Sequence, residues 1–165
     1  MHHIFKFSFV ISILLLSFTI VLAKPAAKGL AWNEYEPLNI SSKSMEFNPE
    51  DDKILFKTDV TIKQADFLLT ADSMVVKKQE GDTFSLMASG NVAIVHGLWQ
   101  AGSDVLEYNS KDKVFLFSGH PKVVHNKNII KGKLIRYYSQ TNKIEVEEPE
   151  TTMYINDLKK NSLNK

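Results

Sequence analysis

The chain repeats one apolar pattern four times, and this internal repeat limits its possible folds more than any other feature. Apolar residues recur in four columns, with separations of 29 and 32 residues between successive copies. The columns are Met45, Met74, Leu106 and Ile135; Phe47, Val76, Tyr108 and Tyr137; Ile54, Leu86, Phe115 and Ile144; and Phe56, Ala88, Phe117 and Val146. A unit of about 30 residues cannot bury its apolar face alone, so we expect the copies to stack on one another.

Within each copy, apolar and polar residues alternate in the manner of half-buried β-strands. This period of two is clear at residues 54–57, 60–63 and 144–147. Turn-forming residues separate the strands at 48–52, 79–82, 109–112 and 139–142. We assign three extra residues of the second copy to its turn. Each copy is therefore predicted to be a hairpin, then a bend near a small or turn-forming residue (Thr58, Gly90 or Gly119), then a further strand.

The first 23 residues have the features of an export signal. Lys6 precedes an uncharged, mostly apolar run, and small residues end it at Ala23. An uncleaved anchor remains the alternative, because residues 4–23 would just span a bilayer core of about 30 Å. With either outcome we expect the rest of the chain to lie outside the cytoplasm. We predict a signal peptide at 1–23, a linker at 24–36, one domain at 37–156 and a disordered polar tail at 157–165.

Composition excludes several functional classes. The chain has no cysteine, which removes disulfides, thiolate metal sites, cysteine nucleophiles and lipoprotein attachment. Its net charge is +1 and it has no run of five or more basic residues, so nucleic acid is not expected as a partner.

Several polar side chains invite a catalytic or metal-binding interpretation that their spacing does not support. They are His96, His120, His125, Asp66, Asp72 and Asp104. The histidines are single rather than paired on one strand, so a surface or hydrogen-bonded role is the simpler account. The aspartates precede strands, where they commonly stabilise turns. Together with the absence of nucleophile-elbow, phosphate-loop and metalloprotease motifs, this predicts no enzyme activity, no metal and no cofactor.

Seven short stretches carry a resemblance to a known family: residues 37–40, 56–62, 69–72, 90–92, 106–108, 117–119 and 130–137. In this order and spacing they resemble the OstA-like family of periplasmic lipopolysaccharide-transport proteins, the LptA type, over about residues 37–155. The resemblance implies an open β-jellyroll of two antiparallel sheets. It also implies head-to-tail stacking into a bridge from an inner-membrane anchor protein to an outer-membrane barrel, with lipopolysaccharide carried inside. Thr58 departs from the family, which commonly has glycine there.

A carrier of this kind needs an apolar interior, because each methylene moved out of water is worth about 0.8 kcal/mol. The alternation directs one set of side chains inward, although such residues are commonly plain core. The predicted lipid-binding residues are Phe47, Phe56, Val76, Leu86, Leu106, Tyr108, Phe115, Phe117, Ile135 and Tyr137.

Head-to-tail association also needs open sheet edges. We predict partner edge strands at 38–41 and 152–155, with Leu38, Ile40, Met153 and Ile155 as the contacting residues. Two other interpretations stay open at this point. One is a membrane-anchored, LptC-like member that receives lipid at the inner membrane. The other is a polymerising β-solenoid scaffold that binds no lipid.

Overall fold

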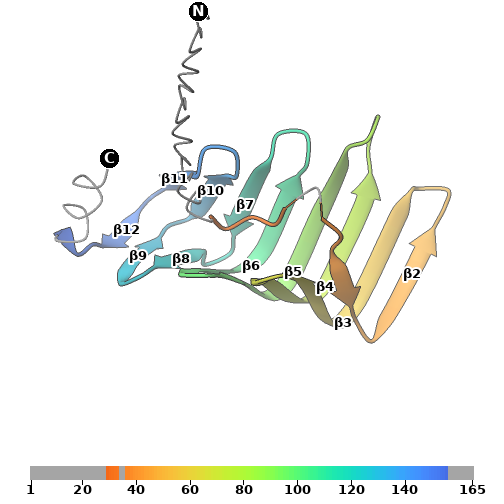
Figure 1. Ribbon diagram of the computed structural model, residues 1–165, viewed down its shortest axis with the longest axis horizontal. Helices are drawn as coiled ribbons and strands as arrows, with labels where there is room; N and C mark the ends of the chain where they lie inside the picture. Colours follow the sequence, from red (N-terminus) through yellow and green to blue (C-terminus); the bar gives the residue numbers. More distant parts are fainter. Residues whose placement is uncertain (1–28, 34–35, 156–165) are drawn as a thin grey trace, which may run out of the picture.

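The computed structural model describes residues 29–33 and 36–155, and within them the chain forms twelve β-strands that pair antiparallel (Figure 1). The strands are β1 (Asn39–Ser41), β2 (Ser44–Asn48), β3 (Lys53–Gln64), β4 (Phe67–Lys78), β5 (Phe84–His96), β6 (Trp99–Asn109), β7 (Val114–Ser118), β8 (Lys122–His125), β9 (Asn128–Lys131), β10 (Leu134–Tyr138), β11 (Lys143–Glu147) and β12 (Glu150–Thr152). The all-β prediction is confirmed.

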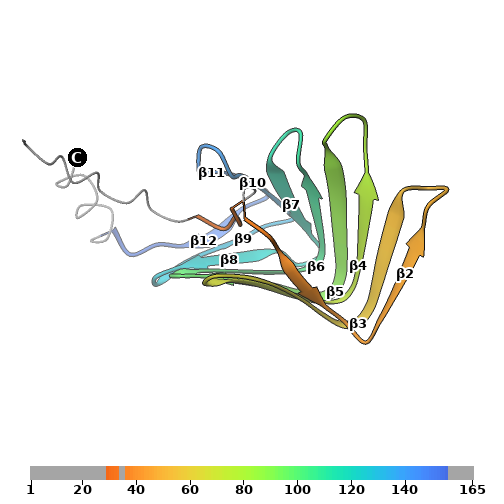
Figure 2. The same cartoon turned by 45° about the vertical axis from the view of Figure 1, so that its right-hand side comes forward.

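Four long strands bend in the middle and thereby divide the sheet into two layers. The pairing register shifts between Lys57 and Val60 in β3, between Thr70 and Ser73 in β4, and between Ser89 and Val92 in β5. β6 likewise pairs β7 with one half and β8 with the other. The two halves of each long strand therefore belong to different layers, which lie at an angle to each other (Figure 2).

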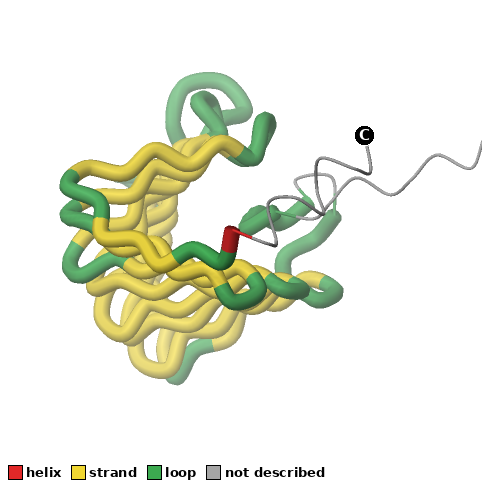
Figure 3. Tube along the Cα trace, turned by 90° about the vertical axis from the view of Figure 1, so that its left-hand side faces the viewer, coloured by secondary structure: helices red, strands yellow, loops and turns green. Residues whose placement is uncertain are grey.

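We name the layers by their place in Figure 1. In the upper sheet, parts of β3, β4, β5 and β6 lie between β2 on one side and β7, β10 and β11 on the other. In the lower sheet, the other parts of the same strands lie between β1 and the run β8, β9 and β12. The layers meet along the bends and open on the opposite side, which we call the mouth (Figure 3). The predicted two-sheet open jellyroll is thus one unclosed twelve-stranded sheet, folded over on itself.

The bends are built at one position of the repeat. Thr58, Gly90, Gly119 and Glu148 occupy this position, with φ values of 64°, 76°, 69° and 49°. The left-handed backbone region is favourable for glycine and uncommon for other residues. Thr58, the departure from the family pattern, keeps the same backbone conformation, so the bend does not require glycine at this point.

A polar pair closes each bend across the two chain segments that pass it. The four pairs are Lys43 Nζ to Asp59 Oδ2 at 2.7 Å, Asn91 Nδ2 to Asp72 Oδ2 at 2.9 Å, His120 Nδ1 to Asp104 Oδ2 at 2.9 Å, and Lys133 Nζ to Glu148 Oε1 at 3.1 Å. Asp72 and Asp104 therefore lie at the bends inside β4 and β6, where they pair across the bend, and do not precede strands as predicted. Asp66 lies in the two-residue turn between β3 and β4.

The hairpin turns of the upper sheet correct one detail of the sequence prediction. Three of these turns have four residues, and the turn of the second copy has five, at 79–83. The other two extra residues of that copy lengthen its strands by one pair, Lys78 with Phe84. The insertion falls partly in the strands because the alternation continues through it.

The predicted signal peptide (1–23) and the predicted tail (157–165) lie outside the described residues. Within the described part of the chain, no helix is long and apolar enough to cross a membrane.

Substitution of the bend glycine in the third copy tests this account. Gly119 and Gly81 have nearly the same φ, 69° and 68°. A Cβ at Gly119 would lie 2.6 Å from Asp104 Cβ, whereas a Cβ at Gly81 would meet nothing within 4 Å. Gly81→Ala should lower the free energy of unfolding by about 1 kcal/mol through backbone strain alone. Gly119→Ala should cost about 1–3 kcal/mol more, because Asp104 is crowded as well.

Urea unfolding followed by circular dichroism measures both values. Equal losses in the two variants would contradict a tightly packed bend.

Candidate functional site

Two continuous rows of side chains cross the inner face of the upper sheet. The first row, in pairing order, is Met45, Phe56, Met74, Ala88, Leu106, Phe117, Ile135 and Val146. The second is Phe47, Ile54, Val76, Leu86, Tyr108, Phe115, Tyr137 and Ile144. These rows contain the four columns of the repeat and no other residues. The spacing of the sequence repeat therefore follows from the pairing register of the sheet, which places equivalent residues of each copy in the same row.

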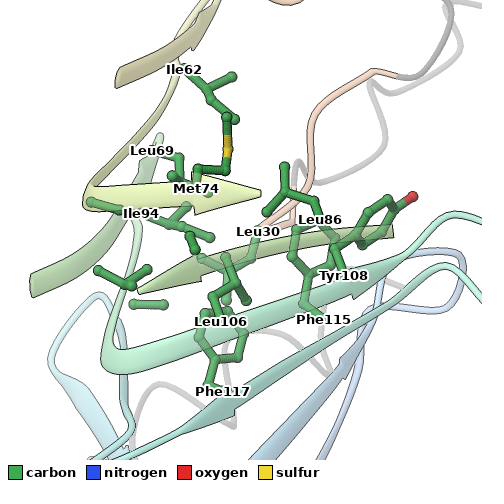
Figure 4. Close-up of a cluster of buried hydrophobic side chains, with 14 of the residues drawn as sticks. Leu30, Ile62, Leu69, Met74, Leu86, Ile94, Leu106, Tyr108, Phe115 and Phe117 are labelled. Carbon is green, nitrogen blue, oxygen red and sulfur yellow. The ribbon is translucent and has the colours of Figure 1, made fainter. Parts of the chain in front are cut away.

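The lower sheet faces these rows with a row of its own. Its members, in pairing order, are Ile40, Ile62, Leu69, Ile94, Ala101, Val123 and Ile130. Figure 4 shows side chains from both sheets in one cluster, with Ile62, Leu69 and Ile94 in the same cluster as Leu106 and Phe117. We call the space that the three rows enclose the trough.

The middle of the trough is buried and its first end is exposed. Met74, Leu106 and Ile135 are fully buried, whereas Met45, at the same position of the first copy, is 59% exposed. Phe47 is 58% exposed, although its counterpart Tyr137 is fully buried. At the other end Ile144 and Val146 are half-buried. Exposure here follows from place in the stack, because the terminal copies have a neighbour on one side only.

All ten predicted lipid-binding residues lie in the two upper rows. Phe56, Leu86, Leu106, Tyr108, Phe115, Phe117, Ile135 and Tyr137 are buried. Val76 is half-buried and Phe47 is exposed. That list lacks the wall of the lower sheet, Ile62, Leu69, Ile94 and Val123, whose alternation within β3, β4, β5 and β8 is the signal that finds them.

A short segment that the sequence places in a linker enters the trough instead. We call residues 29–33 the strap. Leu30 is fully buried and Trp32 is 7% exposed. The Trp32 ring meets three rings edge-on or nearly so: Phe67 in the lower sheet at 5.5 Å, and Tyr108 and Phe115 in the upper sheet at 4.7 and 5.0 Å between centroids. Trp32 therefore connects the two sheets at the mouth. The linker prediction is wrong for the strap.

Hydrogen bonds hold the strap backbone in the mouth at its first end, residues 29 and 30. The Leu30 N–H donates to the Tyr137 hydroxyl at 3.0 Å, and that hydroxyl donates to Asn142 Oδ1 at 2.5 Å. His96 Nδ1 donates to the Gly29 carbonyl at 2.6 Å. Burial raises the pKa of Tyr137, and the bond from the Leu30 N–H opposes that rise.

At the far end of the strap, the buried side chain of Gln64 holds the backbone. Its Oε1 accepts from the Asn33 N–H at 2.6 Å, and its Nε2 donates to the Asn33 carbonyl at 2.8 Å. The same Nε2 donates to the Glu36 carbonyl at 2.9 Å. Gln64 lies at the end of β3, where the layers open, so the strap follows the mouth from the β10–β11 turn to β3.

The free energies that hold the strap in the mouth can be compared with the cost of ordering it. Burial of Leu30 and Trp32 contributes about 3–6 kcal/mol. Fixing the backbone of the five strap residues costs about 5–10 kcal/mol. Each hydrogen bond or ring contact adds about 0.5–1.5 kcal/mol. The favourable contributions therefore match or exceed the cost of ordering the strap, and because no strand contains a strap residue, the strap adds no strand pairing to the sheet.

The segments predicted as edge strands lie at or beside the two ends of the described sheet, but the strands have different bounds. β1 and β2 pair only with β3, and β11 and β12 only with β10 and β9, so both ends of the described sheet are edges. Ile40 lies in β1, but Leu38 precedes it. Met153 and Ile155 follow β12, which ends at Thr152, opposite Ile129 of β9. Met153 and Ile155 are exposed, at 53% and 68%.

The histidines are dispersed. His96 supports the strap and lies 3.3 Å from Asp66 Oδ1, His120 is at a bend, and His125 stacks on Trp99 at 4.0 Å. Burial lowers the pKa of His125. Across residues 29–33 and 36–155, no three His, Cys, Asp or Glu side chains converge as metal ligands.

A second cleft, of about 790 Å³, lies near the hairpin ends of the upper sheet and is lined mainly from its outer face. Val75, Met87 and Leu116 line it together with the charged Lys77, Glu107 and Arg136. It lacks the continuous apolar rows of the inner face, so the trough is the better candidate for a functional site.

Comparisons with known proteins agree with this geometry. The family model described as LptA/(LptD N-terminal domain) LPS transport protein matches residues 39–143. The fold is similar to the crystal structure of LptH from Pseudomonas aeruginosa, the LptA homologous periplasmic component of its lipopolysaccharide transport device. The TM-score is 0.67 at 14% identity, and the match covers 73% of this chain and 96% of that chain. No curated protein matches the chain.

Truncation of one buried and one exposed row residue tests the packing of the trough. Phe117→Ala should lower the free energy of unfolding by about 3–5 kcal/mol, because Phe117 is fully buried. Phe47→Ala should change it by less than about 0.5 kcal/mol. Chemical denaturation monitored by circular dichroism gives both values. Similar values for the two variants would mean that the rows are not packed as described.

Proposed function

Because the chain belongs to the LptA and LptD N-terminal-domain family of lipopolysaccharide transport proteins, we propose that it is a non-enzymatic carrier that binds lipopolysaccharide in the trough. The acyl chains lie between the two sheets, and the polar part of the lipid faces the mouth. The carrier acts in the periplasm, the compartment of the similar LptH, and it passes the lipid toward the outer membrane.

The continuity of the apolar rows is the observation that supports this proposal most. The two upper rows cross eight strands without a charged residue. Two packed sheets normally lie about 10 Å apart, a gap that side chains or hydrocarbon can fill. Each methylene that enters such a gap gains about 0.8 kcal/mol relative to water. A lipid with several acyl chains is therefore a suitable ligand, and the Tyr137 hydroxyl at the mouth suits its polar groups.

We propose that the trough continues from one copy of the chain to the next. The β11–β12 end of one copy pairs with the β1–β2 end of the following copy, and the rows join across the contact. The exposed Met45 and Phe47 support this arrangement, because they lie in the rows and are covered once another copy stacks on them. The same edges serve for contacts with an inner-membrane anchor protein and an outer-membrane barrel.

Photo-crosslinking from neighbouring positions tests lipid binding in the trough. Leu86 points into the trough with 2% exposure, whereas the next residue, Met87, points outward with 48% exposure. A photoreactive amino acid in place of Leu86 should capture lipopolysaccharide in Gram-negative cells, and one in place of Met87 should not. Adducts are detected with an antibody against lipopolysaccharide.

Capture of lipopolysaccharide at Met87 but not at Leu86 would contradict the proposal. Absence of adducts at both positions, in cells with continuing lipopolysaccharide transport, would favour the scaffold interpretation.

A charge at the exposed end of the rows tests head-to-tail association. Phe47→Asp should raise the Kd for self-association by at least about tenfold, because a carboxylate is then placed on an apolar contact. Met87→Asp is the control, with similar exposure on the outer face. Sedimentation velocity over a range of concentrations measures both. An equal effect of the two substitutions would point to a different interface.

A further inference from the structure

We propose that the strap is an internal competitor for the lipid site: Leu30 and Trp32 occupy the place of acyl chains, and lipid enters only as the strap leaves. This inference rests on the proposed function and adds its regulation. The trough is packed with side chains of both sheets, and part of the packing, Leu30 and Trp32, comes from a segment outside the sheet.

The first argument is the position of Trp32. Its ring lies between Phe67 of the lower sheet and the pair Tyr108 and Phe115 of the upper sheet. An acyl chain that enters the interior at this part of the mouth lies between these same rings. Because Trp32 is almost fully buried there, the ring and an acyl chain cannot be present at the same time.

The second argument is the position of Leu30. Its branched side chain is fully buried in the cluster of the trough, in the same region as Leu86 and Leu106 (Figure 4). No strand contains Leu30, so its removal leaves the pairing of the sheet intact. The space that it leaves is apolar and accepts hydrocarbon.

The third argument is the chemistry of the mouth. The Tyr137 hydroxyl and His96 Nδ1 each bind the strap backbone through one hydrogen bond, and the Gln64 amide binds it through two, to the Asn33 N–H and carbonyl. Ester and amide carbonyls of a lipid are acceptors of the same kind as the Gly29 and Asn33 carbonyls. The groups that lose the strap can therefore bind the polar linkages of the incoming lipid. A cleft of about 480 Å³ beside the strap, lined by Trp32, Phe67 and His96 among others, opens at this side.

The fourth argument is the close fit of Gly29. A Cβ at this position would lie 1.7 Å from the Tyr137 hydroxyl and 2.1 Å from Asn142 Oδ1. Tyr137 is fully buried, so its ring cannot move aside. Gly29→Ala should therefore push the strap out of the mouth without any change in the sheet.

The fluorescence of Trp32 gives a direct test. The chain has two tryptophans, Trp32 and Trp99, so Trp99→Phe leaves Trp32 as the single reporter. Purified lipopolysaccharide is titrated into this variant of the mature protein, and binding is measured separately by co-sedimentation. The expected result is a saturable red shift of the Trp32 emission, with increased quenching by acrylamide, in parallel with binding. Lipopolysaccharide stripped of its ester-linked acyl chains should produce a smaller shift.

Release variants give an independent readout. Gly29→Ala and Trp32→Ala should each bind lipopolysaccharide with a several-fold lower Kd, because the closed fraction raises the apparent Kd of the unaltered chain. Gly102→Ala is the matched control: its Cβ would make only an ordinary contact of 3.5 Å with the Val92 carbonyl. This control should bind as the unaltered chain does.

The outcomes separate the two proposals. Binding of lipopolysaccharide without a change in Trp32 emission, or weaker binding by the release variants, would overturn the strap proposal and leave the carrier function standing. Absence of binding to the unaltered chain and to both release variants would overturn the carrier function itself.

Discussion

The bend in the four long strands is the constraint on which the rest of this structure depends. An antiparallel sheet of alternating residues has one apolar face, and that face must be covered. Here the sheet covers itself, because left-handed residues at 58, 90, 119 and 148 bend each copy at the same position of the repeat. A polar pair spans each bend, and the buried side chains between the layers hold the layers together. Without the common bend, the three apolar rows would lie in one plane and would not enclose a trough.

Features of the fold that follow from the repeat, such as the apolar rows of the upper sheet, are predicted well from the sequence. The four columns become two rows of the upper sheet, because pairing partners in neighbouring strands have a fixed separation along the chain. Glu148 occupies the fourth bend at the spacing of the repeat, but its residue type does not indicate a turn, and only the first three bends are predicted. The ends of the sheet are less predictable. The alternation suggests a strand as far as Ile155, but β12 ends at Thr152, and the next N–H that is bonded to β9, that of Tyr154, donates to the Asn128 side chain instead of a backbone carbonyl.

The strap shows a limit of a different kind. Residues 29–33 have no period, and they lie in a segment, 24–37, whose proline, alanine and glycine content is typical of a linker. Their burial depends on three rings and several polar groups that converge from distant strands. The apolar Leu30 and Trp32 within this segment are the local signal of such docking. The strap also bears on the proposed carrier function, because it places two buried side chains from outside the sheet in the packed interior.

The regular spacing of the rows has a consequence for how such proteins change over evolutionary time. Each complete copy adds two residues to each upper row and two to the lower row. Gain or loss of a whole copy therefore changes the length of the molecule and leaves its cross-section unaltered. The second copy, with its longer hairpin, shows that the tips on the upper side tolerate extra residues while the rows stay in phase. Length and ligand chemistry can thus diverge independently among descendants of one ancestral hairpin.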